Sequence, residues 1–540
     1  MSLRPNNPSA GVYTSEIDVP GRSQPFSVST GVIVAACNRG PVGQRVRVTE
    51  TGRLKKIFGK KDPKVSFGLH CAEDFLQESN SLYFTRVARN AKTAGLLVRT
   101  ISNFADTVKL TQGMVDPTVV GFTESDIMLV YAENPGKWGN GVYVVMYPDV
   151  NDPDNEQFIF EVYEGDSTVP LERFGCTTFY KKSEDGSQLF VEDVVNNLSD
   201  IVRVKFNWNH YQFANNPEPV LINAIIGGPS DPLTGDNNGQ FFGGEDGVTP
   251  TLGDIINAWD LYADHELVDV DILINSGYTD SAVLHKMNEI AQNRLDCIAV
   301  LDLPQNLARP DLAINFRREV LNMNSSSSAL YAPYIKVRDT DAGRSYFIPP
   351  SGKIAGVFAR TDRVAKSWFA PAGTNRGIIT SIEELGYDYD LGDRNALTEN
   401  QINYIRNMSG YGNVVWNADT LYALKSPLND IGVRRLLAIL HRIVRFGQLA
   451  SVFQPNDSFL RSQITTDMNN MLEPIRTDRG LDWYEVVCDE RNNPDVYVAN
   501  GDLVCDVYLD PTRYTKRIHL NAIVPKKGGI KFAESLIDRS

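Results

Sequence analysis

The sequence predicts a multidomain protein of the α/β and α+β classes, with mixed α/β core domains, a β-rich insertion and extended N- and C-terminal arms. Three observations predict this fold class: a strand, helix, strand pattern near the centre, short alternating segments between residues 104 and 242, and two amphipathic helices near the C-terminal end. At 540 residues the chain is too long for one hydrophobic core. Its hydrophobic content of 42% and charged content of 22% indicate a folded globular protein.

The N-terminal end predicts a free arm followed by one strand. The first eleven residues, "MSLRPNNPSAG", are rich in Pro, Asn and Ser. Tyr13, Ile17 and Val19 then fall on one side of an extended chain, which Pro20 and Gly21 stop. A lone strand after a loose tail needs a sheet, which belongs either to the same subunit or, by strand addition, to a neighbour.

The next regions predict a mixed segment and then the β-rich insertion. Residues 31–36 and 81–88 have strand patterns, and residues 66–79 have a helix pattern. Between residues 104 and 242, short alternating segments are broken by Gly, Asn, Asp and Pro. One turn there, "DVNDPDNEQ", is acidic but lacks the central glycine and terminal glutamate of a calcium-binding EF-hand loop, so we expect no metal.

The centre predicts a parallel sheet. Val268–Ile274 reads as a strand, Val283 to Leu295 repeats apolar residues at helical spacing, and Cys297–Leu301 reads as a second strand. Strand, helix, strand at this spacing predicts a right-handed crossover. Asp302 and Pro304 would follow at the carboxyl end, where ligands bind in open α/β sheets, but no glycine-rich phosphate turn follows the first strand.

A loop at residues 367–377, "SWFAPAGTNRG", has no helical or strand periodicity. Its small residues and Arg376 suit a ligand-binding loop, because a backbone can approach phosphate there and arginine can grip it. The alternative is a structural loop that packs its own aromatic, Trp368.

The C-terminal region predicts two helices. Residues 433–447 carry an apolar stripe, and four side chains collect away from it: Arg434, His441, Arg442 and Arg445. Such a basic side is ordinarily a solvated face, and in an acidic protein it can also meet an acidic partner. The second helix begins after a cap at Asn456 or Asp457. Strands are expected at residues 482–489, 502–510, 516–524 and 530–532.

Composition and motifs exclude several functions. The net charge of −14 argues against a general nucleic-acid binder. The six cysteines include no CxxC pair, so we expect mostly buried thiols and no zinc site. Residues 1–30 lack a signal peptide and no apolar run approaches the about 18 residues that span a bilayer, so we expect a protein made and kept in the cytoplasm, with no membrane insertion. There is no GxSxG, P-loop, GxGxxG or HExxH motif, so we expect no catalytic, cofactor-binding or metal site.

Several segments together resemble the contractile tail sheath family of bacteriophages and related injection machines. They are "GVYTSEIDVPGR" near the N-terminus, "FGGEDG" at residues 242–247, "CIAVLDLP", "APAGTNRG", "LTENQINYIRNMSGYGNVVWNADTL", "RRLLAILHRIVRFGQLASVFQPND" and "VVCDERNNP". Their order, spread from residue 11 to about 515, carries the resemblance. Asn417 and Asp419 depart from the family pattern, which usually has Gly and commonly Arg there. Family likeness favours a packing role for the 367–377 loop.

The resemblance implies a non-enzymatic structural subunit that polymerises as stacked hexameric rings around a tail tube. Contraction of the sheath would drive the tube through the host cell envelope for genome delivery. The implied partners are other copies of the chain, the tube protein, and baseplate and tail terminator proteins, in a virion assembled in the host cytoplasm. The implied parts are an N-terminal arm (1–25), a first core segment (26–103), a β-rich outer insertion domain (104–242), an α/β sheath domain (243–421), a C-terminal core domain (422–515) and a C-terminal arm (516–540).

Two hypotheses name residues. The terminal strands would pair between subunits through Tyr13, Ile17, Val19, Ile518, Leu520, Val524, Ile530 and Phe532. The basic helix side, Arg434, His441, Arg442 and Arg445, would face an acidic tube. The alternatives are a hydrolase with an α/β core, which lacks its Asp, His and Ser signatures here, and a virion adhesin component, which would not account for the arms.

Overall fold

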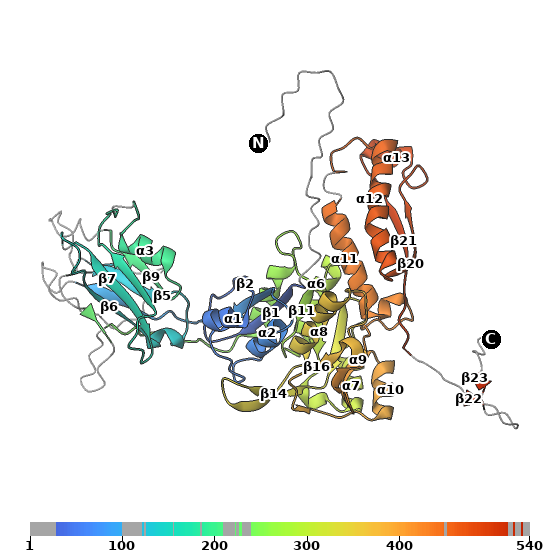
Figure 1. Ribbon diagram of the computed structural model, residues 1–540, viewed down its shortest axis with the longest axis horizontal. Helices are drawn as coiled ribbons and strands as arrows, with labels where there is room; N and C mark the ends of the chain where they lie inside the picture. The colour runs from blue at the N-terminus through green and yellow to red at the C-terminus, as the bar shows by residue number, and fades with distance from the viewer. Residues whose placement is uncertain are drawn as a thin grey trace, which may run out of the picture.

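The computed structural model describes residues 29–99, 121–123, 126–154, 156–183, 186–208, 222, 226–228, 239–447, 451–516, 522–523 and 531–532. Figure 1 shows a central α/β body, a β-rich domain on one side of it and a helical unit with a two-stranded ribbon on another side. The mixed fold with several separate sheets is confirmed. Among these residues, no helix combines the length and the apolar character needed to cross a bilayer.

The body is built on a nine-stranded sheet with the order β16-β19-β18-β13-β12-β11-β1-β3-β2. The six strands from β18 to β3 are parallel, and β2, β19 and β16 are antiparallel to their neighbours. Their bounds are β1 Gly31–Ala36, β2 Val46–Val48, β3 Leu82–Val87, β11 Ile272–Ile274, β12 Ile298–Asp302, β13 Ser328–Ala332, β16 Ile378–Ile379, β18 Ile402–Met408 and β19 Gly412–Val415. The predicted parallel crossover is confirmed, because Ile272 pairs with Ile298 across β11 and β12.

Both faces of this sheet are covered, which explains why its strands are apolar throughout. All six residues of β1 are buried: Ile33 and Ala35 face one core cluster, and Val32 and Val34 face the other. Helices α2 (Gly68–Leu76) and α8 (Ser351–Val364) cover the first face. Helices α5 (Leu252–Trp259) and α6 (Ser281–Arg294) cover the second face.

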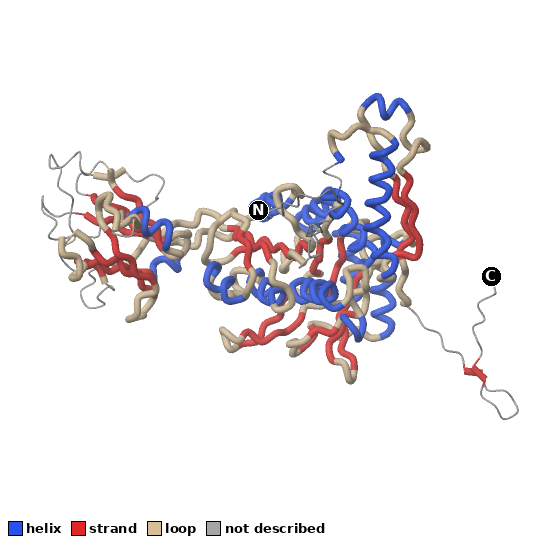
Figure 2. Tube along the Cα trace, turned by 45° about the horizontal axis from the view of Figure 1, so that its top comes forward, coloured by secondary structure: helices blue, strands red, loops and turns tan. Residues whose placement is uncertain are grey.

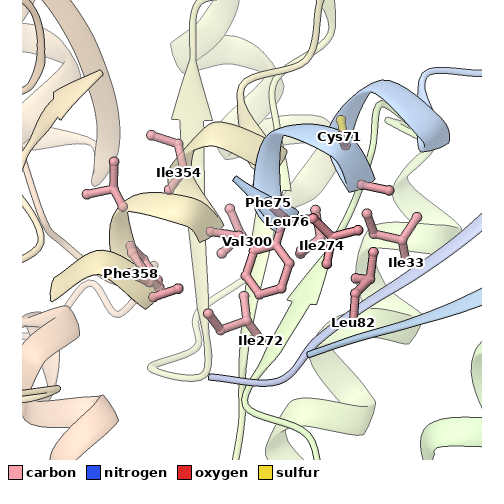
Figure 3. Close-up of a cluster of buried hydrophobic side chains, with 14 of the residues drawn as sticks. Ile33, Cys71, Phe75, Leu76, Leu82, Ile272, Ile274, Val300, Ile354 and Phe358 are labelled. Atoms are coloured by element: carbon pink, nitrogen blue, oxygen red, sulfur yellow. The ribbon is translucent and has the colours of Figure 1, made fainter. Parts of the chain in front are cut away.

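The contact between α2 and α8 needs a glycine. Figure 3 shows Phe75 and Leu76 of α2 lying with Ile354 and Phe358 of α8 over Ile272, Ile274 and Val300 of the sheet. A Cβ atom added to Gly352 would lie 2.5 Å from Cys71 Cα, which is closer than real Cβ contacts allow. The two helices therefore touch backbone to backbone at this point.

The β-rich domain holds its own core between two sheets. One sheet has the order β4-β5-β9, and the other has the order β10-β6-β7-β8. Their bounds are β4 Gly95–Arg99, β5 Asp126–Ala132, β9 Val202–Phe206, β10 Ile226–Gly227, β6 Val142–Pro148, β7 Phe158–Glu164 and β8 Glu172–Cys176, with α3 at Val191–Leu198. Figure 2 shows that this domain stands away from the body.

One strand lies on the other side of the boundary that the sequence predicts. We expected residues 26–103 in the core, but β4 pairs antiparallel with β5 of the β-rich domain. The reason is packing, since Leu96 and Val98 of β4 are fully buried in the cluster between the two outer sheets. The buried Arg86 side chain spans the junction and donates from Nη1 to the Pro135 carbonyl at 2.6 Å.

The C-terminal unit consists of two helices and a ribbon. Its elements are α11 (Ile431–Gly447), α12 (Ser458–Thr477), β20 (Leu481–Val487), α13 (Asp495–Asn500) and β21 (Asp506–Pro511). The Asp457 side chain caps α12 by accepting from the Leu460 amide at 2.8 Å, which decides between the two predicted caps. One ribbon face, with Tyr484, Val486, Val507 and Leu509, packs toward the helices.

The remaining elements are short. The helices are α1 Thr51–Phe58, α7 Pro310–Asn315, a π-helix at Phe316–Leu321, α9 Gly373–Arg376 and α10 Leu391–Glu399, with 3₁₀ turns at Lys137–Gly141, Asp260–Tyr262, Gln305–Leu307 and Pro427–Asn429. The strands are β14 Ile335–Asp339, β15 Arg344–Ile348, β17 Glu384–Leu385, β22 Ala522–Ile523 and β23 Lys531–Phe532.

Candidate functional site

The residues just before β1 are bonded firmly to the body. The Thr30 amide donates to Asp271 Oδ2 at 2.8 Å, and the Ser29 hydroxyl donates to Asp362 Oδ2. The Ser79 hydroxyl donates to the Ser29 carbonyl at 2.8 Å. We call Ser29 and Thr30 the N-terminal root, because the chain enters the described body there.

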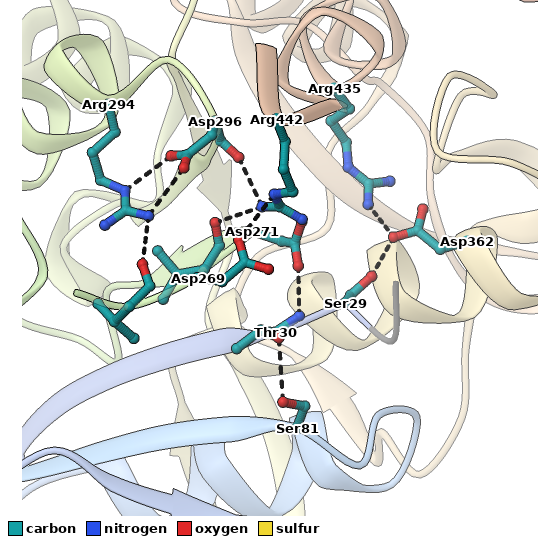
Figure 4. Close-up of polar contacts among 12 residues, drawn as sticks. Ser29, Thr30, Ser81, Asp269, Asp271, Arg294, Asp296, Asp362, Arg435 and Arg442 are labelled. Carbon is teal, nitrogen blue, oxygen red and sulfur yellow. Dashed lines mark hydrogen bonds and ion pairs between the residues drawn. The ribbon is translucent and has the colours of Figure 1, made fainter. Parts of the chain in front are cut away.

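Helix α11 reaches the same two carboxylates from the other side. Figure 4 shows Arg435 against Asp362 and Arg442 against Asp271, with the N-terminal root beyond them. The Arg435 Nη2 to Asp362 Oδ2 distance is 2.5 Å, and the Arg442 Nη1 to Asp271 Oδ1 distance is 2.6 Å. Two arginine–carboxylate ion pairs, each also hydrogen-bonded to a root residue, therefore link the C-terminal unit to the N-terminal root.

Burial and the partner's charge have opposite effects on the pKa values of Arg442 and Asp271. Burial raises the pKa of Asp271, and the nearby Arg442 guanidinium limits that rise. Burial lowers the pKa of Arg442, but Asp271 and Asp269 outweigh it, so the pKa of Arg442 is raised overall. The ion pair therefore offsets part of the cost of burying both groups, and removing either would leave an uncompensated buried charge.

The remaining cations of α11 also contact the body. Arg445 Nη1 lies 3.2 Å from Asp296 Oδ2, whose carboxylate is also held by Arg294, and Arg434 Nη2 donates to the Leu295 carbonyl at 3.1 Å. Asp271 and Asp296 precede β11 and β12, so this joint lies at the amino-terminal ends of the sheet strands.

The prediction that Arg434, His441, Arg442 and Arg445 form a solvated face is wrong for the arginines that the body holds. Arg434 is 5% exposed and the Arg442 side chain is 14% exposed, whereas His441 is exposed. The reason is that α11 packs on two sides: Leu436 and Leu440 face α12, and the arginines face the body. The aspartates that pair with Arg442 and Arg445, at positions 269, 271 and 296, carry no shared sequence motif.

The C-terminal end of the described body has a second anchor, also beside α11. Lys516 Nζ lies 2.6 Å from Asp419 Oδ1 and 2.5 Å from Asp430 Oδ1, and the Tyr514 hydroxyl donates to the Ala418 carbonyl at 3.2 Å. Burial opposes the charge of Lys516, but Asp419 and Asp430 raise its pKa overall. We call Tyr514 and Lys516 the C-terminal root. Asp419, which departs from the family pattern, thus forms an ion pair with Lys516.

The ribbon offers unpaired strand edges. In the described part of the chain, β20 and β21 pair only with each other, so each has a free outer edge. The face away from α12 carries Trp483 and Tyr508, which are 52% and 55% exposed. Two-stranded sheets are marginal alone, and exposed edges are templates for a further strand.

The predicted strand residues fall almost entirely elsewhere. Tyr13, Ile17, Val19, Ile518, Leu520, Val524 and Ile530 lie outside the described residues. Phe532 belongs to β23, which pairs with β22 of the same chain through Phe532 and Ala522.

The 367–377 loop packs its own aromatic. Trp368 joins the cluster under the ribbon, and its Nε1 donates to the Asp478 carbonyl at 3.1 Å. A Cβ on Gly432 would lie 2.4 Å from the Trp368 carbonyl oxygen, so α11 passes directly over this loop. Arg376 Nε donates to the Ala370 carbonyl at 3.0 Å within the loop.

The carboxyl end of the sheet is occupied by a structural carboxylate. Asp302 is fully buried and accepts from the Ser351 amide at 2.9 Å, the Ser351 hydroxyl at 2.7 Å and the Gly277 amide at 3.0 Å. Desolvation raises the pKa of Asp302 to about 7, and the hydrogen bonds act against that rise. This carboxylate ties α8 to the end of β11. Nowhere in the described residues do three or more His, Cys, Asp or Glu side chains group to hold a metal ion.

Comparison with known proteins gives this architecture a class. Residues 249–421 match the family model for the phage tail sheath protein central domain. The chain is 29% identical over 298 residues to the tail sheath protein of Enterobacteria phage T4, and 27% identical over 307 residues to that of Vibrio phage KVP40. These matches cover 52% of this chain in both cases, and 45% and 46% of the two relatives.

Two crystal structures extend the likeness over most of the chain. The sheath tail protein of Listeria innocua superposes with a TM-score of 0.56 at 11% identity, covering 89% of this chain and 95% of that one. The sheath tail protein of Desulfitobacterium hafniense gives a TM-score of 0.52 at 13% identity, covering 89% and 94%. The fold is therefore that of a sheath protein, and the resemblance to the contractile tail sheath family is confirmed. The matched region spans about half the length of the curated relatives.

Proposed function

We propose that this chain is a structural, non-enzymatic subunit of a contractile tail sheath. It would polymerise as stacked hexameric rings around a tail tube, between baseplate and tail terminator proteins, and contract to drive the tube through the host envelope. Its place would be the virion tail, after assembly in the host cytoplasm. The match of residues 249–421 to a sheath central domain supports this function.

The observation that carries the proposal is the pairing of anchored roots with an open ribbon. The N-terminal root is hydrogen-bonded to Asp362 and Asp271, which pair with arginines of α11, and the C-terminal root is held through the ion pairs of Lys516. An arm that leaves a fixed root can exchange strands with a neighbour without loosening its own subunit. The free edges of β20 and β21 are suitable acceptors, since an added strand gains backbone hydrogen bonds along the whole ribbon.

Strand addition also suits a polymer that changes shape. Backbone hydrogen bonds between an arm and a ribbon persist while the bodies rotate about the arms. The energy of contraction would then come from the difference in buried contacts between two packings of the same subunit, with no nucleotide required.

A tube contact of α11 is proposed in a narrower form. Of the four residues on the basic side, His441 is exposed and Arg445 is 27% exposed at its side chain. Arg434 and Arg442 are committed to the body. A tube would therefore meet α11 through His441 and the accessible part of Arg445.

Deletion of residues 1–20 tests the arm mechanism. We expect a soluble, folded monomer that no longer polymerises, because the body and its root at Ser29 and Thr30 stay intact. Sedimentation velocity measures assembly, and circular dichroism checks the fold. A matched control replaces residues 1–20 with a Gly/Ser segment of equal length, which keeps the tether and removes the strand pattern. Normal polymers from either variant would contradict the proposed role of the arm.

A further inference from the structure

Two cysteines face each other across the base of the ribbon. The last pair of the β20–β21 ladder is Val487 with Asp506. Continuing this antiparallel register by one residue places Cys488 opposite Cys505. Directly opposite residues of antiparallel strands have Cα atoms about 4.5–5.5 Å apart. That separation falls within the about 4.4–6.8 Å that a disulfide spans.

The strands are also tied together just beyond this pair. The Asn493 side chain, which is 3% exposed, accepts from the Val504 amide at 2.7 Å and donates to the Val504 carbonyl at 2.8 Å. Its Nδ2 also donates to the Asp489 carbonyl at 3.1 Å. Asp489 and Val504 are the next residues in the same register. Cross-strand links therefore flank the two cysteines on both sides and keep the thiols together.

The two thiols lie in one apolar cluster. Cys488 and Cys505 pack with Leu460, Ile464 and Met468 of α12. Both cysteines are free, and each thiol influences the pKa of the other. Cys488 is 4% exposed, whereas Cys505 is only partly buried, so we expect a small reagent to react first at Cys505.

We propose that Cys488 and Cys505 form a reversible oxidation site, which is a dithiol in a reducing compartment and an intramolecular disulfide once the protein meets a low-molecular-weight disulfide such as oxidised glutathione. The Cys505 thiolate attacks oxidised glutathione, which forms a mixed disulfide and releases one glutathione thiolate. The Cys488 thiolate then attacks Cys505 Sγ and releases the second glutathione thiolate. The two thiol protons pass to the two glutathiones, so two cysteines are oxidised and one glutathione disulfide is reduced. This site does not depend on the proposed function.

The surroundings make this oxidation slow near neutral pH. Burial raises the pKa of Cys505 to about 12, and Cys488 and Asp506 act in the same direction. Burial also raises the pKa of Cys488, with Asp489 and Asp506 adding to it and with Cys505 and Arg461 opposing it. Because only the thiolate reacts, the initial rate rises about tenfold per pH unit below the pKa of the attacking thiol.

Non-reducing peptide mass spectrometry tests the site. The full-length protein is incubated with oxidised glutathione between pH 7 and pH 9 and quenched with N-ethylmaleimide. We expect one cross-linked pair, Cys488 with Cys505, a rate that rises about tenfold per pH unit, and full reversal by dithiothreitol. The four buried cysteines, Cys37, Cys71, Cys176 and Cys297, should all carry N-ethylmaleimide only after denaturation.

Two variants make the result decisive. Cys488→Ser should stop at a stable glutathione adduct on Cys505, because the resolving thiol is gone. Asn493→Ala should slow cross-linking several-fold, because the side-chain hydrogen bonds that link Asp489 and Val504 are lost. Free Cys488 and Cys505 after exposure that oxidises the denatured chain would overturn the proposal. So would a disulfide between chains in place of the internal one.

Discussion

Helices α2 and α8 pack against the central body with apolar side chains, whereas α11 packs against the same body with charges. The first contact consists of fully buried groups such as Phe75, Ile354 and Phe358 (Figure 3). The second contact consists of Arg435 with Asp362 and Arg442 with Asp271 (Figure 4). Apolar packing is non-directional and fixes a permanent core. Paired charges fix one geometry and cost free energy when separated, which suits a joint that must hold the arm root in place.

The largest expected effect lies in the apolar contact. Phe75→Ala removes a fully buried ring from between α2 and the sheet, so we expect the free energy of unfolding to fall by about 3–5 kcal/mol in urea denaturation. Lys56→Ala is the control, because the Lys56 and Asp200 side chains are 62% and 67% exposed, and it should change stability by less than about 0.5 kcal/mol. A loss at Phe75 no larger than the control would show that this core is not tightly packed.

The charged joint should respond in a different way. Arg435→Met leaves Asp362, whose side chain is 7% exposed, without its cation, so we expect a loss of about 3 kcal/mol. Adding Asp362→Leu should recover most of that loss, since two apolar groups then replace the pair. Hydrogen exchange at the N-terminal root should be faster in the double variant than in the unsubstituted protein, because Ser29 has lost its carboxylate partner. Equal stability of the single and double variants would contradict this account of the joint.

Two glycines of α8 give a matched test of close packing. Gly352→Ala should cost about 1–3 kcal/mol, because the added carbon would lie 2.5 Å from Cys71 Cα and would push α2 away. Gly356→Ala has a nearest contact of 3.4 Å to the Asp74 carbonyl oxygen, so we expect a gain of up to about 1 kcal/mol from helix propensity. Thermal denaturation of both variants measures the difference, and similar shifts for the two would refute the close contact.

The last prediction concerns the pH dependence of stability. The pKa of Asp302 is about 7 in the folded protein and near 3.8 when it is exposed, so between these values the folded state binds more protons than the unfolded state. Stability should therefore fall as the pH rises from about 4 to 7, with a slope of up to about 1.4 kcal/mol per pH unit from this group. Asp302→Asn should flatten that slope in urea titrations between pH 5 and pH 7. An unchanged slope in the variant would assign the pH dependence to other groups.

Local periodicity predicted the parts of the fold that depend on neighbouring residues. The β11, α6, β12 crossover and the α12 cap at Asp457 are of this kind. The sequence did not reveal that β4 joins the outer sheet, since its apolar pattern fits either core equally well. Strand pairing between residues that are far apart in the sequence decides which core such a strand joins.

The candidate site was harder to predict for the same reason. The charge pattern of α11 pointed to the right residues but to the wrong surroundings, because Asp269, Asp271 and Asp296 meet the helix only after the sheet has formed. Cys488 and Cys505 are likewise brought together by strand register and not by a sequence motif.

Negative-stain electron microscopy of the purified full-length protein, at increasing concentration, tests the central claim most directly. The account predicts ringed, hollow tubes, formed either by the protein alone or after its tube protein is added. Wide tubes from the protein alone would indicate that the contracted packing has the lower free energy. Discrete, monodisperse particles at every concentration, with and without the tube protein, would contradict a sheath function.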